Sequence, residues 1–69
     1  MPWQRKIRRL YNMPVGVSFI NGRGTSGILC GAQSGELYIL EYICQDQFAL
    51  KRYDFNEIDD INPFPPCNR

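Results

Sequence analysis

The sequence predicts a mainly β protein, with a short N-terminal α-helix followed by a five-stranded, strongly bent antiparallel barrel. Four of the six glycines fall in one stretch, Asn21 to Gly31, between runs of β-forming residues. The rest of the chain alternates short apolar runs with tight turn signals, and so short a meander can bury both faces of its sheet only by rolling up. We therefore expect a single domain over residues 1–69, with a helix at about 4–12, a barrel at about 14–62 and a proline-rich tail at 63–69.

The glycine-rich stretch is expected to turn and bend one pair of strands. Asn21-Gly22 predicts a type I′ hairpin turn, in which both central residues need a positive φ. Gly27 and Gly31 lie four apart in the strand that follows, and the period of two would place them on one face. Missing side chains there let the strand bend or let another backbone approach. A phosphate-binding loop is excluded, because the Gly-Lys-Ser/Thr ending is absent and no helix follows.

Residues Gln4 to Asn12 predict a short amphipathic helix. Its apolar face carries Trp3, Ile7, Leu10 and Tyr11, which recur at helical spacing. The helix is expected to stop at Asn12, since the residue before a proline avoids the α region and Pro14 follows closely. So short a helix is unstable alone in water, and we expect it to lie on the open end of the barrel.

Five strands are expected to follow the helix, joined by short turns. The apolar alternation places them at Val15–Ile20, Thr25–Ala32, Glu36–Ile43, Gln47–Tyr53 and Ile58–Asn62. The link 54–57 reads as one 3₁₀ turn. Residues 36–43 are apolar on both faces, which indicates a central strand covered by the core on one side and by the helix or a second subunit on the other.

The charge is unevenly distributed along the chain. Residues 1–12 carry four basic residues and no acidic one, whereas residues 13–69 carry four basic and seven acidic residues. A basic segment on an acidic body suggests an anionic partner or the acidic face of a neighbouring copy, with a solvated helix face as the alternative. No apolar run approaches 18 residues, so no secretory signal or membrane partner is expected and a cytoplasmic location is favoured.

No set of residues for catalysis or for metal binding is recognisable. The chain has no histidine, and its three cysteines are widely spaced, so a zinc site is not expected. Cys30 and Cys44 are expected to be small core or interface residues, and Cys67 to be exposed in the tail. The acidic residues near the last turn lack the spacing of a calcium loop and read as a solvated rim: Asp54, Glu57, Asp59 and Asp60. We expect no enzyme activity, no cofactor and no small-molecule substrate.

The helix, the five strands, the Asn-Gly turn and the Gly-x-x-x-Gly spacing resemble the Sm-like fold, an SH3-like barrel of the Sm and LSm proteins and the bacterial RNA chaperone Hfq. The resemblance covers about Gln4 to Asn62. Glycines and apolar residues of the first Sm motif correspond to Gly22, Gly27, Leu29, Gly31, Leu37 and Ile39. Residues of the second motif correspond to Leu50, Arg52 and Ile58.

The RNA-reading positions of that family are altered in this chain. Gln33 stands where the family has an Asp, and Glu36 where an Asn reads a uridine. A carboxylate repels phosphate and cannot donate a hydrogen bond to a base. Tyr53 replaces the Gly or His of the second motif, and Asp54 adds a further negative charge. Only Arg52, with Lys51, carries over as a phosphate contact, and pairing of Arg52 with Glu57 or Asp59 is the alternative.

The resemblance leaves three functions open. The first is a non-enzymatic, self-assembling interaction module, a homo-oligomer such as a ring of five to seven copies, with interface residues Phe48, Leu50, Tyr53, Ile58 and Ile61. The second is an Hfq-like RNA-binding protein that uses Arg5, Lys6, Arg8, Arg9, Lys51 and Arg52. The third follows from a weaker likeness, in the ending from Ile58 to Pro63, to short proteins of spore-forming bacteria: a structural spore-coat or envelope component linked through Cys67. All three point to a bacterial protein.

Overall fold

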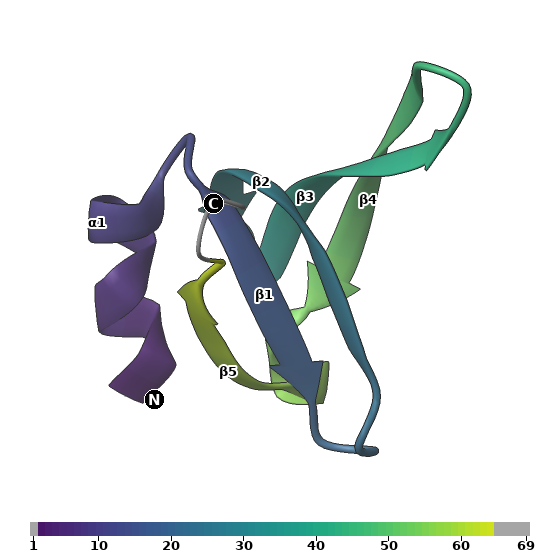
Figure 1. Cartoon of the computed structure of the whole chain (residues 1–69). Helices are drawn as coiled ribbons and strands as arrows, with labels where there is room; N and C mark the ends of the chain where they lie inside the picture. Colours follow the sequence, from purple (N-terminus) through teal and green to yellow (C-terminus); the bar gives the residue numbers. More distant parts are fainter. Residues whose placement is uncertain (1, 65–69) are drawn as a thin grey trace.

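The computed structural model describes residues 2–64 and consists of a short helical segment followed by five strands (Figure 1). The elements are η1 Pro2–Lys6, α1 Ile7–Leu10, β1 Pro14–Phe19, β2 Gly24–Gln33, β3 Glu36–Cys44, β4 Gln47–Asp54, η2 Phe55–Glu57 and β5 Ile58–Pro63. All five expected strands are confirmed to within one residue at each end, and so is the 3₁₀ turn before the last strand.

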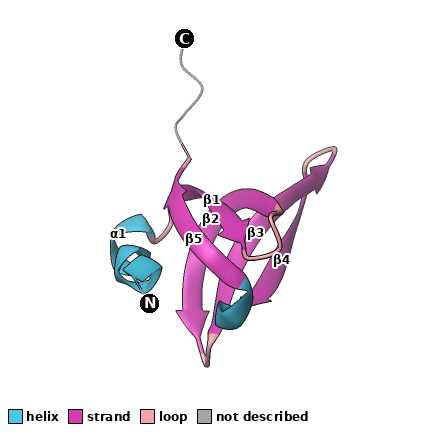
Figure 2. Cartoon of the chain, turned by 90° about the horizontal axis from the view of Figure 1, so that it is seen from below, coloured by secondary structure: helices cyan, strands magenta, loops and turns pink. Residues whose placement is uncertain are grey.

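The strands form one antiparallel sheet in the order β4-β3-β2-β1-β5. The sheet bends strongly around the core, as two views at right angles show (Figures 1 and 2). Within residues 2–64, β4 and β5 are not paired with each other. The predicted mainly β architecture is therefore confirmed as a bent sheet with two edges, and closure into a barrel by hydrogen bonds is not seen in this part of the chain.

The helical segment differs from the expected helix in type and in length. Its first five residues form a 3₁₀ helix, and the α-helical part ends at Leu10 rather than Asn12. Asn12 takes a positive φ of 65° and its backbone N–H donates to the Leu29 carbonyl oxygen at 2.7 Å. This hydrogen bond to β2 replaces the one that would have continued the helix.

The core lies on the concave side of the sheet and includes the apolar face of the helical segment. Trp3 and Leu10 are almost fully buried, and the Trp3 ring packs edge-on against Phe55 with centroids 5.0 Å apart. The predicted apolar face of the helix is confirmed at these positions, whereas Tyr11 is 52% exposed. The strands contribute the other buried side chains: Val15, Val17, Leu29, Leu37, Ile39, Ile58 and Ile61.

The prediction of a type I′ turn at Asn21-Gly22 is wrong, although a turn does form there. The connection is a four-residue loop, residues 20–23, in which Gly22 has a φ of 92° and Asn21 does not have a positive φ. The Asn21 side chain instead accepts a hydrogen bond from the Arg23 backbone N–H at 2.9 Å. Paired positive φ angles, as in type I′ turns, occur at the other two hairpins, in Ser34-Gly35 and Gln45-Asp46.

The prediction that Gly27 and Gly31 share one face is also wrong. A bulge lies between Leu29 and Gly31 and shifts the register of β2 against β3 by one residue. Gly31 pairs with Tyr38, whose neighbours in β3 face the core, whereas Gly27 pairs with buried Val15. Only Gly27 therefore lies on the core face. A Cβ atom there would come within 2.4 Å of the Leu40 carbonyl oxygen, so this glycine permits the close packing of β2 on β3.

Candidate interaction surfaces

The outer half of the β3–β4 hairpin, residues 42–50, projects from the body of the molecule and is called the arm here (Figure 1). Tyr42 and Phe48 face each other across the two strands with ring centroids 5.5 Å apart, and both are more than half exposed. Ile43 and Leu50 are 54% and 55% exposed. The helical segment borders only the start of the outer face of β3, where Ile7 and Tyr11 lie near Tyr38, and it does not reach the arm (Figures 1 and 2).

The long edge of β4 offers free backbone groups. Phe55 N–H donates to the Gly35 carbonyl oxygen at 2.8 Å, which fixes the alternation of the ladder between β3 and β4. By this alternation Ala49 and Lys51 bond to β3, whereas Phe48, Leu50 and Arg52 point their N–H and C=O groups away from the sheet. Within residues 2–64 none of these outward groups has a hydrogen-bond partner. An open edge of this kind is a template for pairing with another strand.

The edge of β5 is closed by side chains. Phe64 N–H donates to the Pro14 carbonyl oxygen at 3.0 Å, so Ile61 is a residue whose backbone groups point away from β1. Its N–H donates to the Asp60 carboxylate at 2.8 Å, and its carbonyl oxygen accepts from Lys6 Nζ at 3.1 Å. Pro63, the next residue on this edge, has no N–H. The two edges of the sheet are therefore unlike: β4 is open and β5 is capped.

Lys6 is the centre of this cap rather than a free cation. Its Nζ also bonds Asp60 Oδ1 at 3.1 Å and Asn62 Oδ1 at 2.9 Å. The ammonium group lowers the pKa of the Asp60 carboxyl group, chiefly through this hydrogen bond. Lys6–Asp60 is the one ion pair in the part of the chain that the structure describes. The contact ties the helical segment to β5.

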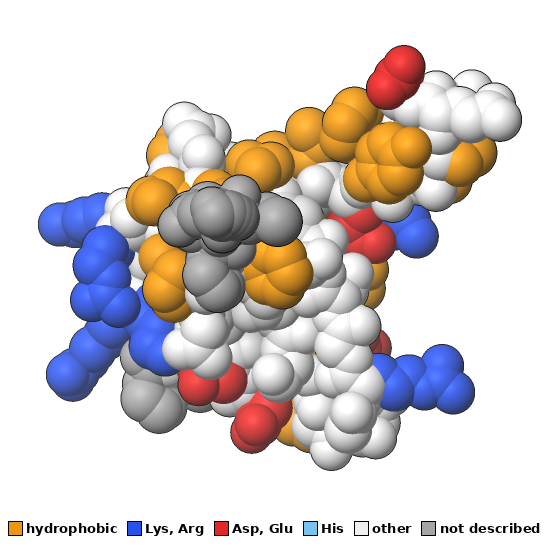
Figure 3. Space-filling model, in the orientation of Figure 1, with side chains coloured by type: hydrophobic (Ala, Val, Ile, Leu, Met, Phe, Trp, Pro, Cys, Tyr) orange, Lys and Arg blue, Asp and Glu red, His pale blue; other side chains and the backbone are white. Residues whose placement is uncertain are grey.

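The other basic candidates are exposed but lie on two separate sides. Arg5, Arg8 and Arg9 form a basic strip along the helical segment, on the left of the molecule in Figure 3. Lys51 and Arg52 lie on β4, at the other edge of the sheet. Arg52 makes no ion pair with Glu57 or Asp59 within residues 2–64, so that alternative is not seen. The structure does not bring the six RNA-binding candidates together.

The rim of the sheet at the β2–β3 turn carries two acidic residues, Glu36 and Asp54. The Phe55–Gly35 hydrogen bond brings the β2–β3 turn next to the segment after β4. In this arrangement Glu36 lies directly opposite Asp54 in the register of β3 and β4. Two adjacent carboxylates repel a phosphate group, so this rim is unfavourable for RNA.

The five interface candidates divide into two exposed, one half-buried and two core residues. Phe48 and Leu50 are exposed on the arm, whereas the side chains of Ile58 and Ile61 face the core. Tyr53 is half-buried, and its hydroxyl donates to the Glu41 carboxylate. Burial, with a smaller contribution from Glu41, raises the pKa of Tyr53 to about 12.

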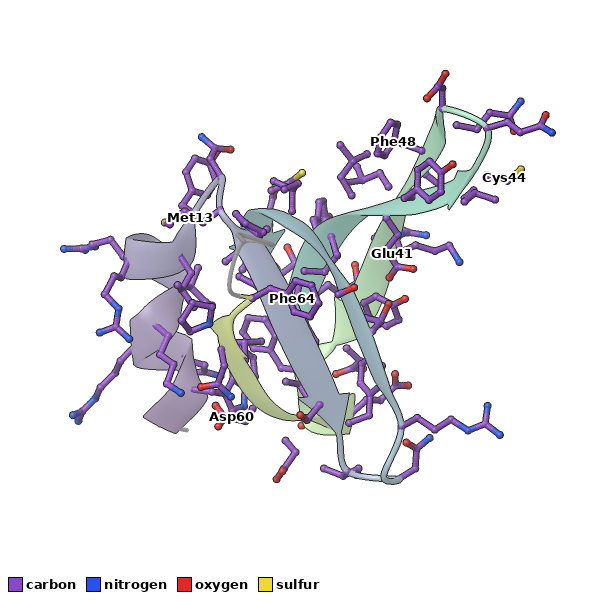
Figure 4. The ribbon with its side chains drawn as sticks, in the orientation of Figure 1. Met13, Glu41, Cys44, Phe48, Asp60 and Phe64 are labelled. Carbon is purple, nitrogen blue, oxygen red and sulfur yellow. The ribbon has the colours of Figure 1, made fainter. Side chains whose placement is uncertain are left out.

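The two cysteines within residues 2–64, Cys30 and Cys44, lie in different strands. Cys30 is half-buried in β2, and its Sγ lies 3.7 Å from the Ile28 carbonyl oxygen. Cys44 is exposed near the tip of the arm, so it is not a core residue (Figure 4). Cys67 lies outside the described residues. Residues 2–64 contain no group of acidic or cysteine side chains that could hold a metal ion, and no helix among them is long and apolar enough to cross a membrane.

Comparisons with protein-family models, with curated proteins and with solved structures find no match to this chain. Sequence reasoning missed the cap on β5, because Lys6 and Asp60 lie 54 residues apart and neither stands in a recognisable motif. The apolar run of β3 did signal an uncovered surface. It did not reveal that this surface would project as an arm beside an open edge.

Proposed function

We propose that this protein is a non-enzymatic interaction module that assembles with copies of itself. The observation that carries the proposal is the open edge of β4, whose outward backbone groups belong to Phe48, Leu50 and Arg52. The same edge borders exposed apolar side chains on the arm. Unpaired strand edges and exposed apolar patches both favour association with another chain.

The energetic balance of so small a domain supports a role for a neighbour. A chain of this length buries only about 60% of the surface that its unfolded form exposes. Much of the arm consists of exposed residues, in contrast to the body of the sheet. A partner that covered the arm would stabilise the folded state by mass action, because it binds the folded form alone.

Sedimentation velocity of the full chain tests this proposal. The experiment covers about 5–500 μM in the presence of a thiol reductant, so that cysteine cross-links do not contribute to the mass. We expect a sedimentation coefficient that rises with concentration toward a defined oligomer. A monomer of 8.0 kDa at every concentration would contradict the proposal.

RNA binding through the helical segment is a second candidate, favoured by the basic strip of Arg5, Arg8 and Arg9 (Figure 3). Three arginines that make no ion pair within residues 2–64 can contact successive phosphates. Filter binding of U-rich and A-rich RNA at low and moderate salt tests it. We expect retention at low salt that is lost when the three arginines are replaced by Gln.

The matched control for the RNA experiment replaces Lys51 and Arg52, the exposed basic residues on β4, by Gln. We expect this variant to retain RNA as the unmodified chain does, because β4 lies on the other side of the sheet. Absence of retention of the unmodified chain at low salt removes this candidate.

A further inference from the structure

We propose that two copies associate by pairing β4 with β4 about a two-fold axis at Leu50, rather than by pairing β4 with the β5 edge of a neighbour. The inference rests on the proposed function, because it specifies which surface a second copy occupies. It follows from the unlike edges of the sheet and from the residues that β4 presents. The result would be one continuous antiparallel sheet through both copies.

The cap on β5 opposes a head-to-tail arrangement. A strand added at β5 would have to bond Ile61, but both backbone groups of this residue already have partners in Asp60 and Lys6. Pro63 offers no N–H on the same side. The register against β1 also shifts between Ser18 and Phe19, so β5 is irregular near its start. A neighbour could add here only after the Lys6 contacts had opened.

The edge of β4 is complementary to itself. Antiparallel pairing centred on Leu50 places this residue opposite Leu50 of the second copy. The same register places Phe48 opposite Arg52 of the second copy, and the two-fold axis repeats this pair with the roles of the two copies exchanged. All three residues have outward N–H and C=O groups, so each can exchange backbone hydrogen bonds. A guanidinium group beside an aromatic ring adds a cation–π contact.

The side chains that this pairing brings together share one face. Phe48, Leu50 and Arg52 are every second residue along β4, so their side chains point to the same side of the sheet. Tyr42 of β3 lies next to Phe48 on that side. Leu50 of each copy would lie in the centre, flanked by the Phe48 rings. In Figure 3 the apolar surface extends from the body onto the arm, where this joint would form.

Charge and area favour a second copy over a membrane or a nucleic acid on this surface. The arm carries a single charged side chain, Asp46, in its terminal turn, where a negative charge opposes insertion into lipid and contact with phosphate. Arg52 lies just beyond the arm on the same edge, and the two-fold register places it beside Phe48 of the second copy. The pairing joins residues 48–52 and the apolar side chains beside them, so the interface belongs to the small class, for which about 1,200 Å² is the lower limit of stable complexes. We therefore expect a dimer with a dissociation constant in roughly the micromolar range.

Charge substitutions at Leu50 test the two-fold geometry. Facing Cα atoms of a hydrogen-bonded antiparallel pair lie about 5.5 Å apart, so Leu50→Lys places two positive charges side by side and Leu50→Glu two negative ones. We expect each variant alone to dimerise at least about tenfold more weakly than the unmodified chain. An equimolar mixture should restore dimers that contain one copy of each, as measured by sedimentation and native mass spectrometry. Leu50 is 55% exposed, so both variants should fold, which circular dichroism checks.

Two further variants separate this geometry from the alternatives. Ile20→Lys is the matched control: it charges a side chain that is 69% exposed in the β1–β2 loop, and it should leave the dimer unchanged. Lys6→Met opens the β5 cap and should also leave the dimer unchanged. Five to seven copies, or a dimer that neither Leu50 variant weakens, would overturn this inference while self-assembly stands. A monomer at every concentration would overturn both.

Discussion

Gly27 provides the sharpest test of how the sheet is held together. A Cβ atom at this position would lie 2.4 Å from the Leu40 carbonyl oxygen and 2.6 Å from Ile39 Cγ2. The first of these atoms is backbone, so the contact is relieved only by separating β2 from β3. Inserting a methyl group into so tight a site costs about 3 kcal/mol. The whole domain is expected to be stable by only about 3–10 kcal/mol, so Gly27→Ala should remove between about a third and all of its free energy of unfolding.

Gly16→Ala is the matched control, because its Cβ atom would meet only Phe64 Cδ1 at an ordinary 3.5 Å. Gly-to-Ala replacement there restricts the unfolded chain and should be neutral or stabilising by up to about 1 kcal/mol. Urea unfolding can be followed by the fluorescence of Trp3, the single tryptophan, which is 2% exposed. Equal unfolding free energies for the two variants, within about 0.5 kcal/mol, would refute the close packing of β2 on β3.

Three further variants probe the tip, the cap and the half-buried tyrosine. Replacing Gln45-Asp46 by Asn-Gly should raise the urea midpoint by the equivalent of about 1 kcal/mol, because both residues have a positive φ; an unchanged midpoint would contradict this. Lys6→Met should cost about 1 kcal/mol near neutral pH and weaken the acid dependence of stability. Because the pKa of Asp60 is lowered in the folded state, its carboxylate stabilises the fold above about pH 4, and this stabilisation is lost as pH falls. If Lys6→Met left the pH dependence of stability in acid unaltered, that result would count against the cap. Burial raises the pKa of Tyr53 to about 12, so the contribution of this residue to the stability of the fold should be lost as pH rises from 10 to 12. In thermal melts, Tyr53→Phe should lack that part of the alkaline loss of stability. Identical alkaline profiles would disprove the assignment.

The strand pattern could be predicted from the sequence because it depends on local signals. Apolar alternation and turn residues place every strand to within one residue at each end. The type of turn was less predictable. The Asn21 side chain accepts a hydrogen bond from the Arg23 backbone N–H, and within this loop only Gly22 takes a positive φ. Conversely, Gln45 is a poor residue for a positive φ, yet it takes one in the two-residue turn that joins β3 to β4.

The candidate surfaces depend on contacts between residues far apart in the sequence, which periodicity does not reveal. The bulge after Leu29 inverts the faces of β2, so a strict period of two misplaced Gly31. Lys6 reads as one of four equivalent basic residues, yet it alone reaches the edge of β5. Ile61 has the apolar character of an interface residue, but the sheet directs it into the core. Sequence periodicity gives the face of a residue within one strand, whereas the cap and the open edge arise from how the strands are ordered.

Amide hydrogen exchange, followed residue by residue at several protein concentrations, tests self-association through β4 most directly. Ala49 and Lys51 bond to β3 within one copy, so their N–H groups should be protected at every concentration and serve as internal controls. The N–H groups of Phe48, Leu50 and Arg52 point away from the sheet. They should exchange rapidly in dilute solution and become protected as the concentration rises through the micromolar range. Rapid exchange of these three amides at concentrations where sedimentation detects oligomers would place the contact elsewhere and contradict the proposal.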